Sequence, residues 1–253
     1  MNETTLEKMK QMRFYGMHSA FKTALENEQT DGYTTDEFVA FLIDNEHDDR
    51  HTRKINRYIT NARFRYSAEL ENIYYEEGRN LERNKIMRLA ECSFIKEGEN
   101  ILITGSTGVG KSYIASALGH HGCSKGYKVM YFNAAKLFAK MKMAKVDASY
   151  IREMARIERL DLLIVDDFGL QPMDSQARLV LLDLVEDRHA KNPMIITSQI
   201  PVEGWYDVIG EKTVADAIMD RVVHNAHRIE LKGESMRKKR AKNQQTKTME
   251  VIN

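Results

Sequence analysis

One stretch in the middle of the chain, ILITGSTGVGKSYIASAL at residues 101–118, limits the possible folds more than any other feature. An aliphatic block precedes a loop with three glycines, and an alanine-rich segment follows the loop. The loop fits the pattern G-x-x-x-x-G-K-[ST], with Gly105, Gly110, Lys111 and Ser112 at the fixed positions. A strand before this pattern and a helix after it are the context that the pattern requires. The sequence therefore predicts a strand–loop–helix unit with a phosphate-binding loop (the P-loop).

The residue types in this loop suit a polyphosphate. Glycines let the backbone approach a ligand closely and adopt positive φ. The N–H groups of the loop and the positive end of the following helix dipole then face the anion. We expect Lys111 to reach the outer phosphates and the Ser112 hydroxyl to hold Mg²⁺. A glycine-rich turn that binds no ligand is the alternative interpretation.

Composition limits the protein class. The chain has 253 residues, of which 42% are hydrophobic and 30% charged, which allows one α/β domain and a small second domain. The net charge of +1 gives no whole-chain reason to expect a nucleic acid, so that inference needs local patches. Two cysteines and an N-terminus without an apolar signal core favour a cytoplasmic protein. No aliphatic run is long enough to cross a membrane.

Residues 1–72 show helical periodicity and almost no strand signal. The pattern predicts one helix that ends near Gly32, and a second helix that begins at a capping box of Thr34 and Glu37. A third helix, basic on one side and apolar on the other, is expected over residues 50–70. We therefore expect a small all-α domain over residues 1–72.

From residue 81 strand patterns alternate with helical ones, and residues 73–80 are interpreted as a linker before them, so we expect a second domain over residues 73–235. The strand candidates are ENILITG, YKVMYF, DLLIVDD, PMIITSQ and HRIELKG. The helices between them are expected to start near Ser112, Ala134, Ser149, Ser175 and Thr213. Such alternation predicts a parallel sheet with right-handed crossovers. Residues 236–253 lose all periodicity and are predicted to form a mobile basic tail.

The segment LLIVDDFG at residues 162–169 supplies the acids that a P-loop needs for hydrolysis. Asp166 is expected at the carboxyl end of a buried strand, near the cation held by Ser112. Asp167 follows, is expected to point the other way, and could polarise the attacking water. A buried strand that ends in an acidic turn is the alternative interpretation.

The next strand, PMIITSQ, ends in the polar residues Thr197, Ser198 and Gln199. If this strand lies between the P-loop strand and the acidic strand, its polar end would reach the outermost phosphate. One of the three residues is then expected to act as a sensor of that phosphate, and a simple loop start is the alternative.

These segments resemble the AAA+ ATPases, and more closely the IstB family, the ATP-binding helper proteins of insertion-sequence transposition, which are related to DnaC helicase loaders. The resemblance covers nearly the whole chain. It rests on MKQMRFYGMHSAF, ARFRYSAELENIYYEEGRNL, GSTGVGKS, LLIVDDFG and ITSQIPVEGWYDVIGEKTVADAIMDRVVHNAHRIELKGESMRKKRAK. It implies an α/β fold of the P-loop NTPase class, with a small all-α N-terminal domain. The AAA+ core would have a parallel five-stranded sheet and no C-terminal lid, because the chain ends soon after HRIELKG.

The resemblance also implies roles for individual residues. Ser112 and Asp166 would hold Mg²⁺. ATP would be bound by Gly105, Ser106, Thr107, Gly108, Val109, Gly110, Lys111, Ser112 and Tyr113. The catalytic residues would be Lys111, Asp167, Ser198 and Arg221.

Three of these catalytic roles come from the position of the residue in the family pattern. Asp167 stands where most AAA+ proteins carry a catalytic glutamate, and Ser198 is the chosen sensor. Arg221 stands at the place of the arginine finger, which acts on the nucleotide of a neighbouring subunit, although an ordinary surface arginine is the alternative. Many AAA+ proteins carry a further sensor arginine on a C-terminal lid, and Arg237 would replace it only weakly.

Three basic patches could bind DNA phosphates without reading the sequence. The first two contain Arg50, Arg53, Lys54 and Arg57, and Lys140, Lys142 and Lys145. The third lies in the tail from Arg237 to Lys242. Solvated helix faces are the alternative interpretation for each patch.

The expected function is that of an ATP-dependent regulator of DNA transposition. The chain would form a homo-oligomer through ATP and Arg221 on duplex DNA, with little sequence preference, and stimulate the transposase of the same insertion sequence. A DnaC-like helicase loader, which would prefer single-stranded DNA, is the alternative. A small-molecule kinase is a third possibility, but it needs a substrate pocket and lid arginines that the sequence does not offer.

Overall fold

The computed structural model describes residues 2–27 and 32–236, and the chain divides into two compact units between Arg57 and Tyr58. The sequence pattern places this division later, at residue 72. The difference arises because the residues after Tyr58 belong to the core of the second unit, where Ala62 and Leu70 are buried.

The first unit consists of helices. They are α1 (Asn2–Gln11), α2 (Tyr15–Glu26) and the greater part of α3 (Thr35–Ala62). The prediction of a single helix before Gly32 is wrong, because Arg13 has a φ of 61° and separates α1 from α2. Part of the loop predicted near Gly32 lies outside the described residues.

The start of α3 confirms the predicted capping box. The backbone N–H of Thr34 donates to the Glu37 carboxylate over 2.8 Å, and the N–H of Glu37 faces the Thr34 hydroxyl at 3.4 Å. The two helices predicted after Thr34 are one continuous helix of 28 residues. It ends at Ala62, eight residues before the predicted end at residue 70, because Arg63 has a φ of 56°.

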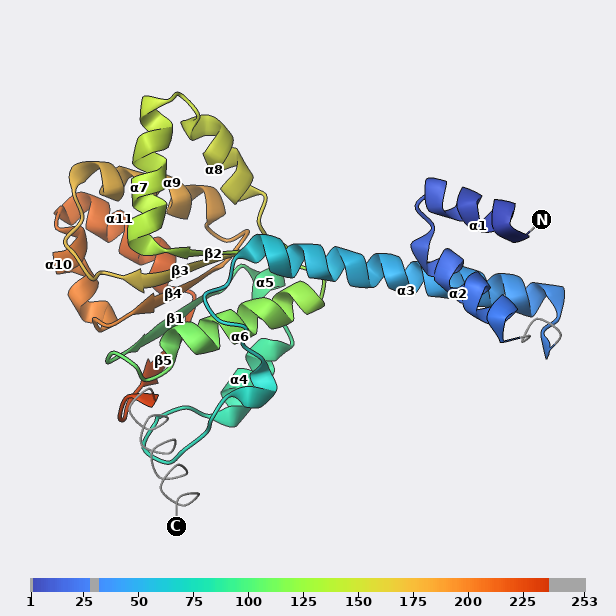
Figure 1. Cartoon of the computed structure of the whole chain (residues 1–253). Helices are drawn as coiled ribbons and strands as arrows, with labels where there is room; N and C mark the ends of the chain where they lie inside the picture. Colours follow the sequence, from blue (N-terminus) through green and yellow to red (C-terminus); the bar gives the residue numbers. More distant parts are fainter. Residues whose placement is uncertain (1, 28–31, 237–253) are drawn as a thin grey trace, which may run out of the picture. The chain divides into compact units, whose positions relative to one another are not determined.

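The second unit is built on a five-stranded sheet in which all pairs are parallel, in the order β2-β3-β4-β1-β5 (Figure 1). The strands are β1 (Asn100–Gly105), β2 (Val129–Asn133), β3 (Leu162–Phe168), β4 (Met194–Ser198) and β5 (Ala226–Leu231). Each coincides with one of the predicted segments. The predicted parallel five-stranded sheet is therefore confirmed.

Helices connect and flank these strands. They are α4 (Arg83–Ala90), α5 (Ser93–Glu97), α6 (Lys111–Ser124), α7 (Ala134–Val146), α8 (Tyr150–Glu158), α9 (Ser175–Arg188), α10 (Trp205–Ile209) and α11 (Lys212–Val223). Two short 3-10 helices, η2 (Leu70–Asn72) and η3 (Val202–Gly204), complete the unit. The five predicted helix starts correspond to those of α6, α7, α8, α9 and α11.

Helices cover both faces of the sheet, and α6 lies on the opposite face from α7 and α9 (Figure 1). Successive residues of a strand point to opposite faces. Ile101 and Ile103 of β1 therefore join the core under α4, α5 and α6, whereas Leu102 joins the core under α7, α9 and α11. This double burial explains why the first four strands are largely continuous apolar runs, whereas β5 alternates exposed and buried residues.

The strand order determines where a ligand can bind. β4 lies between β1 and β3, as the sensor expectation required. The carboxyl ends of these three strands therefore meet at one edge of the sheet, where open α/β sheets bind their ligands.

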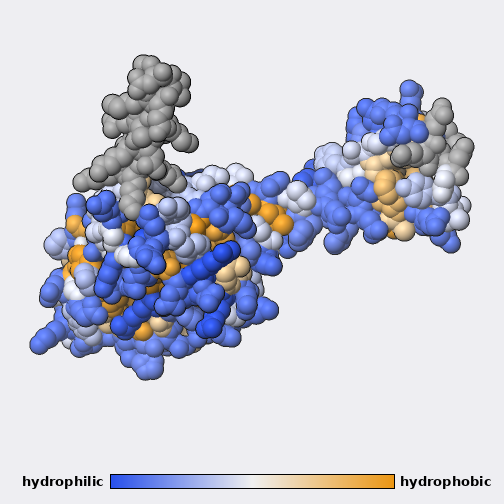
Figure 2. Space-filling model, turned by 90° about the horizontal axis from the view of Figure 1, so that it is seen from below, coloured by the Kyte–Doolittle hydropathy of each residue, from blue (hydrophilic) through white to orange (hydrophobic). Residues whose placement is uncertain are grey.

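The described part of the chain, residues 2–27 and 32–236, contains no helix that is both long and apolar enough to span a bilayer. Hydrophilic side chains cover much of the face in Figure 2, and apolar residues lie among them. Apart from Met236, the predicted tail lies outside the described residues, as does Arg237.

Candidate functional site

The P-loop follows β1 and requires glycine at its tightest points. Gly105 has a φ of 144°, and a Cβ there would lie 2.3 Å from the Leu231 carbonyl oxygen of β5. Gly108 has a φ of 86°, and its Cβ would lie 2.2 Å from the Ser235 hydroxyl. Both the backbone conformation and the space therefore exclude a side chain.

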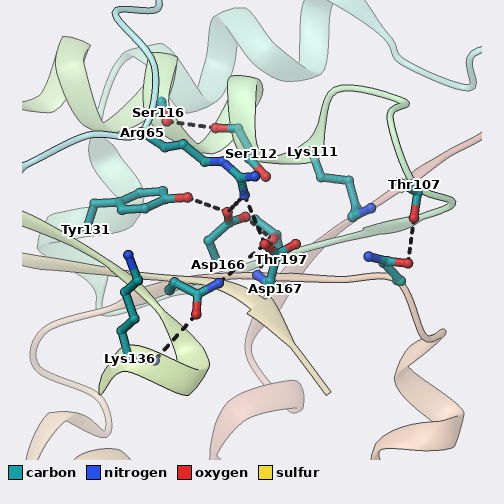
Figure 3. Close-up of polar contacts among 12 residues, drawn as sticks. Arg65, Thr107, Lys111, Ser112, Ser116, Tyr131, Lys136, Asp166, Asp167 and Thr197 are labelled. Carbon is teal, nitrogen blue, oxygen red and sulfur yellow. Dashed lines mark hydrogen bonds and ion pairs between the residues drawn. The ribbon is translucent and has the colours of Figure 1, made fainter. Parts of the chain in front are cut away.

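Lys111 opens α6, and its side chain turns back into the loop. Its ammonium donates to the carbonyl oxygens of Gly105 over 2.8 Å and of Ser106 over 2.9 Å, and the residue is only 5% exposed. The Thr107 hydroxyl donates to Gln199 across the loop over 2.6 Å (Figure 3). The Lys111 ammonium thus donates to oxygen atoms of the loop. Phosphate oxygens are acceptors of the same kind.

A cavity of about 450 Å³ opens beside the P-loop. The predicted site residues that line it are Thr107, Gly108, Gly110, Lys111, Ser112, Tyr113 and Asp167. Its opposite wall comes from the segment after α3, including Arg65, Tyr66, Ile73, Tyr74 and Arg79. This P-loop cavity has the size of a small-ligand site.

The segment 73–80 forms part of this wall, so its interpretation as a linker is wrong. Arg79 is buried, and its guanidinium donates to the carbonyl oxygen of Val109 over 2.6 Å and to that of Tyr74. Burial lowers the pKa of Arg79. The side chain ties the wall to the P-loop.

Asp166 lies at the end of β3, as predicted, and its side chain is 0% exposed. Its carboxylate accepts hydrogen bonds from the Tyr131 phenol, from the Thr197 hydroxyl over 2.5 Å and from Arg65 over 3.2 Å. Burial and the neighbouring Asp166 raise the pKa of Tyr131, so the phenol stays protonated and donates. Three partners thus fix the carboxylate.

Strand alternation predicted that Asp167 would point away from Asp166. The structure shows that it does not. Its φ is 61°, and the pairing of β3 with β4 is irregular between Val165 and Phe168. This distortion lets the Asp167 carboxylate accept from the same Arg65 nitrogen over 2.9 Å, and from Asn133 over 3.3 Å. The two carboxylates (the acid pair) therefore share one cationic partner (Figure 3).

The three polar residues at the end of β4 have different contacts. The Ser198 hydroxyl donates to the carbonyl oxygen of Phe168 over 2.8 Å and is buried against the backbone. Thr197 donates to Asp166 and accepts from the Asp167 N–H over 3.1 Å. Gln199 contacts Thr107 and lines the cavity. Thr197 and Gln199, rather than Ser198, contact the P-loop and the acid pair.

Arg221 lies away from the P-loop of its own chain. Its backbone carbonyl faces the side-chain amide of Asn100 at the start of β1, whereas the P-loop follows the end of β1. The guanidinium donates to the Ala217 carbonyl oxygen over 2.8 Å and pairs with Glu186 at 3.3 Å. This position does not bring Arg221 to the P-loop cavity.

Several residues of the basic patches are paired with acids. The ion pairs are Arg50–Glu46 and Arg53–Asp49, each at 2.6 Å, Lys140–Glu153 at 2.5 Å, and Lys142–Asp174. The Lys145 ammonium lies 4.6 Å from the centre of the Tyr150 ring. Arg57 is exposed.

Sequence reasoning did not identify Arg65, Tyr131, Asn133 and Arg79 as site residues. Arg65 lies 101 positions before Asp166, and no local pattern connects the two. Asn133 and Tyr131 belong to β2, whose end meets that of β3, so the strand order would have suggested them.

The donor set fits Mg²⁺ when a phosphate supplies further ligands. Ser112 and Asp166 offer oxygen atoms, and Mg²⁺ in proteins is held by one or two carboxylates together with substrate phosphates. Among residues 2–27 and 32–236, no cluster of three His, Cys, Asp or Glu side chains could hold a metal ion by itself. The glycine-rich loop and these oxygens therefore fit a metal that arrives with a nucleotide.

Comparisons with known proteins agree with this geometry. Residues 7–244 match the family model described as IstB-like ATP binding protein. An insertion-sequence ATP-binding protein of Sinorhizobium fredii is 40% identical over 234 residues, which cover 92% of this chain and 96% of that protein.

Two solved structures share the fold of the second unit. The DnaC helicase loader matches with a TM-score of 0.54 and 19% identity, over 70% of this chain and 99% of that one. The replication initiator DnaA bound to AMPPCP and single-stranded DNA matches with a TM-score of 0.56 and 18% identity, over 68% of this chain and 52% of that one. With the family match over residues 7–244 and the 40% identical relative, the P-loop and the acid pair show that the chain belongs to the family of IstB-like ATP-binding proteins.

Proposed function

We propose that this protein is an ATP-dependent regulator of DNA transposition. It assembles on duplex DNA, stimulates the transposase of the same insertion sequence in the cytoplasm, and uses ATP hydrolysis to remodel or release the assembly. The observation that carries the proposal is that the P-loop and Asp167 line one cavity, with Asp166 beside them, in a chain similar to insertion-sequence ATP-binding proteins.

The P-loop binds the phosphates of ATP. Lys111 exchanges the carbonyl oxygens of Gly105 and Ser106 for phosphate oxygens. This exchange is favourable because a hydrogen bond from an ammonium to an anion is stronger than one to a neutral carbonyl oxygen. Ser112 and Asp166 hold Mg²⁺, which when bound neutralises phosphate charge. ATP-analogue binding by the structurally similar DnaA supports this assignment.

Hydrolysis rests on three groups. Asp167 orients the attacking water from the edge of the cavity. Thr197 keeps the acid pair in place, because its hydroxyl bonds to both residues of the pair. Arg221 serves the cavity of a neighbouring subunit, which fits its distance from the P-loop of its own chain.

Binding to duplex DNA is attributed to the basic patches. Each patch is weak in one chain, because Arg50, Arg53, Lys140 and Lys142 have acidic partners. An oligomer repeats the patches along the duplex, and repeated weak contacts sum to strong binding.

Lys111→Ala tests the proposal. We expect the variant to lose nucleotide binding and ATP-dependent assembly on duplex DNA, measured by fluorescent-nucleotide titration and analytical ultracentrifugation. Lys125→Ala is the matched control, because Lys125 is exposed and follows the other end of α6. A Lys111→Ala protein that assembles on DNA with ATP as the wild type does would refute the mechanism.

A DnaC-like helicase loader is the second candidate, favoured by the fold shared with the DnaC helicase loader. In this function the chain would still hydrolyse ATP, but it would act on a helicase instead of a transposase. Affinities for duplex and single-stranded DNA of equal length separate the two functions: tighter binding to single strands favours the loader.

A further inference from the structure

Arg65 is the group that covers the acid pair. One guanidinium nitrogen donates to Asp166 over 3.2 Å and to Asp167 over 2.9 Å. Arg65 is 40% exposed and lines the P-loop cavity, whereas the Asp166 side chain is fully buried. The arginine therefore joins the P-loop cavity to the Asp166 carboxylate (Figure 3).

The backbone on either side of Arg65 is anchored by contacts that do not involve the guanidinium. Phe64 packs beside Gly119 of α6, and the Tyr66 ring lies 6.2 Å from the Tyr113 ring, also on α6. The guanidinium lies 5.6 Å from the centre of the Tyr66 ring. The side chain can thus leave the acid pair while the chain on either side keeps its contacts.

Charge explains why the acid pair needs a cation. Two adjacent carboxylates repel each other, and their other partners, Tyr131, Thr197 and Asn133, are neutral donors. Arg65 compensates one of the two negative charges, and a divalent cation compensates both.

We propose that Arg65 is a positioning residue that holds the acid pair in place of the divalent cation and is displaced from Asp166 when Mg²⁺ binds with the nucleotide. Arg65 is thus a competitor of the metal, and its affinity for the acid pair sets the Mg²⁺ concentration at which the site fills. The inference deepens the proposed function, on which it rests.

The test measures metal binding rather than activity. Mn²⁺, a paramagnetic probe that replaces Mg²⁺, is titrated by electron paramagnetic resonance into full-length protein saturated with a non-hydrolysable ATP analogue. For Arg65→Gln we expect Mn²⁺ to bind about tenfold more tightly than to wild type, or ~1.4 kcal/mol. Arg63→Gln, which changes an exposed arginine two positions earlier, is expected to leave the affinity unchanged.

Arg65→Lys keeps the charge on a chain one bond shorter, so it competes less well, and we expect an intermediate Mn²⁺ affinity. If Arg65→Gln does not fold, a tighter affinity in Arg65→Lys than in wild type carries the test. A purely structural Arg65 would give weaker Mn²⁺ binding in both variants, and weaker or equal binding overturns the inference. A wild-type chain that binds no nucleotide overturns the proposed function as well, whereas nucleotide binding with equal Mn²⁺ affinities overturns this inference alone.

Discussion

At the scale of single residues, Thr197 holds the acid pair together. Its hydroxyl donates to Asp166 and accepts from the N–H of Asp167, and the residue is fully buried. An acid that must orient water needs a fixed position, since small displacements of catalytic groups are costly. Like Arg65, Thr197 contacts both residues of the pair, but unlike Arg65 it is fully buried, so its position is the more strongly fixed.

We expect Thr197→Val to lower the rate of ATP hydrolysis by about tenfold or more. The substitution keeps the shape but leaves the partly buried N–H of Asp167 and a buried carboxylate oxygen of Asp166 without their partner, so the free energy of unfolding should fall by about 1–2 kcal/mol. Phosphate release and urea denaturation measure the two effects. Ser198→Ala is the comparison, because Ser198 bonds only to the backbone of Phe168 and Ile200 in the contacts described. If Ser198→Ala abolishes hydrolysis and Thr197→Val does not, Ser198 is the sensor.

At the scale of helices and strands, the packing of α2 on α3 depends on one glycine and one carboxylate. A Cβ on Gly16 would lie 2.3 Å from the Asn45 carbonyl oxygen, so only glycine permits this approach. The Glu46 carboxylate accepts the N–H groups of Gly16 over 2.9 Å and of Met17 over 3.2 Å. Glu46 thus supplies from α3 the acceptors that the first turn of α2 lacks.

This carboxylate makes the packing depend on pH. Burial raises the pKa of Glu46, but hydrogen bonds from Arg50, Met17 and Gly16 outweigh it, and the pKa lies below its ordinary value. A folded-state pKa below the unfolded one stabilises the fold above the unfolded pKa, and this contribution is lost as pH falls through the folded pKa. The protection of α2 should therefore decrease as the pH falls below about 4.5.

We expect Glu46→Gln to weaken the α2–α3 packing at pH 7 by about 1 kcal/mol and to remove most of this pH dependence. Hydrogen exchange of α2 peptides in the full chain, corrected for intrinsic rates, measures both. Glu26→Gln, at the exposed end of α2, is the control. If the protection of α2 changes with pH to the same extent in Glu46→Gln and in the wild type, Glu46 is not the source of the pH dependence.

The elements differ in how far the sequence predicts them. Four of the five strands were predictable because a strand buried on both faces is a continuous apolar run, as in LLIV before Asp166, whereas β5 alternates exposed and buried residues. The breaks at Arg13 and Arg63 were not, because arginine is uncommon at positive φ and carries no turn signal. The P-loop residues follow from a local motif, but the pairing of Arg65 with the acid pair depends on the fold.

At the scale of the whole molecule, the place of Arg221 predicts that one chain is an incomplete ATPase. Its backbone carbonyl faces Asn100, at the end of β1 opposite the P-loop, and its guanidinium contacts Ala217 and Glu186. An arginine finger acts on the nucleotide of a neighbouring subunit. In that arrangement the P-loop of one subunit and Arg221 of the next form one active unit.

Two inactive variants should therefore restore activity when they are mixed. Lys111→Ala lacks nucleotide but keeps Arg221, whereas Arg221→Ala binds nucleotide but lacks the finger. In an equal mixture, an intact P-loop meets an intact Arg221 only where an Arg221→Ala subunit binds ATP and a Lys111→Ala subunit supplies Arg221. Because this interface holds ATP, it is the one that the proposed assembly allows, and phosphate release on DNA should rise well above that of either variant alone. Arg221→Ala mixed with the double variant Lys111→Ala, Arg221→Ala is the control and should stay inactive. An Arg221→Ala protein that hydrolyses ATP alone at the wild-type rate, or a mixture no more active than its parts, would show that Arg221 does not act between subunits.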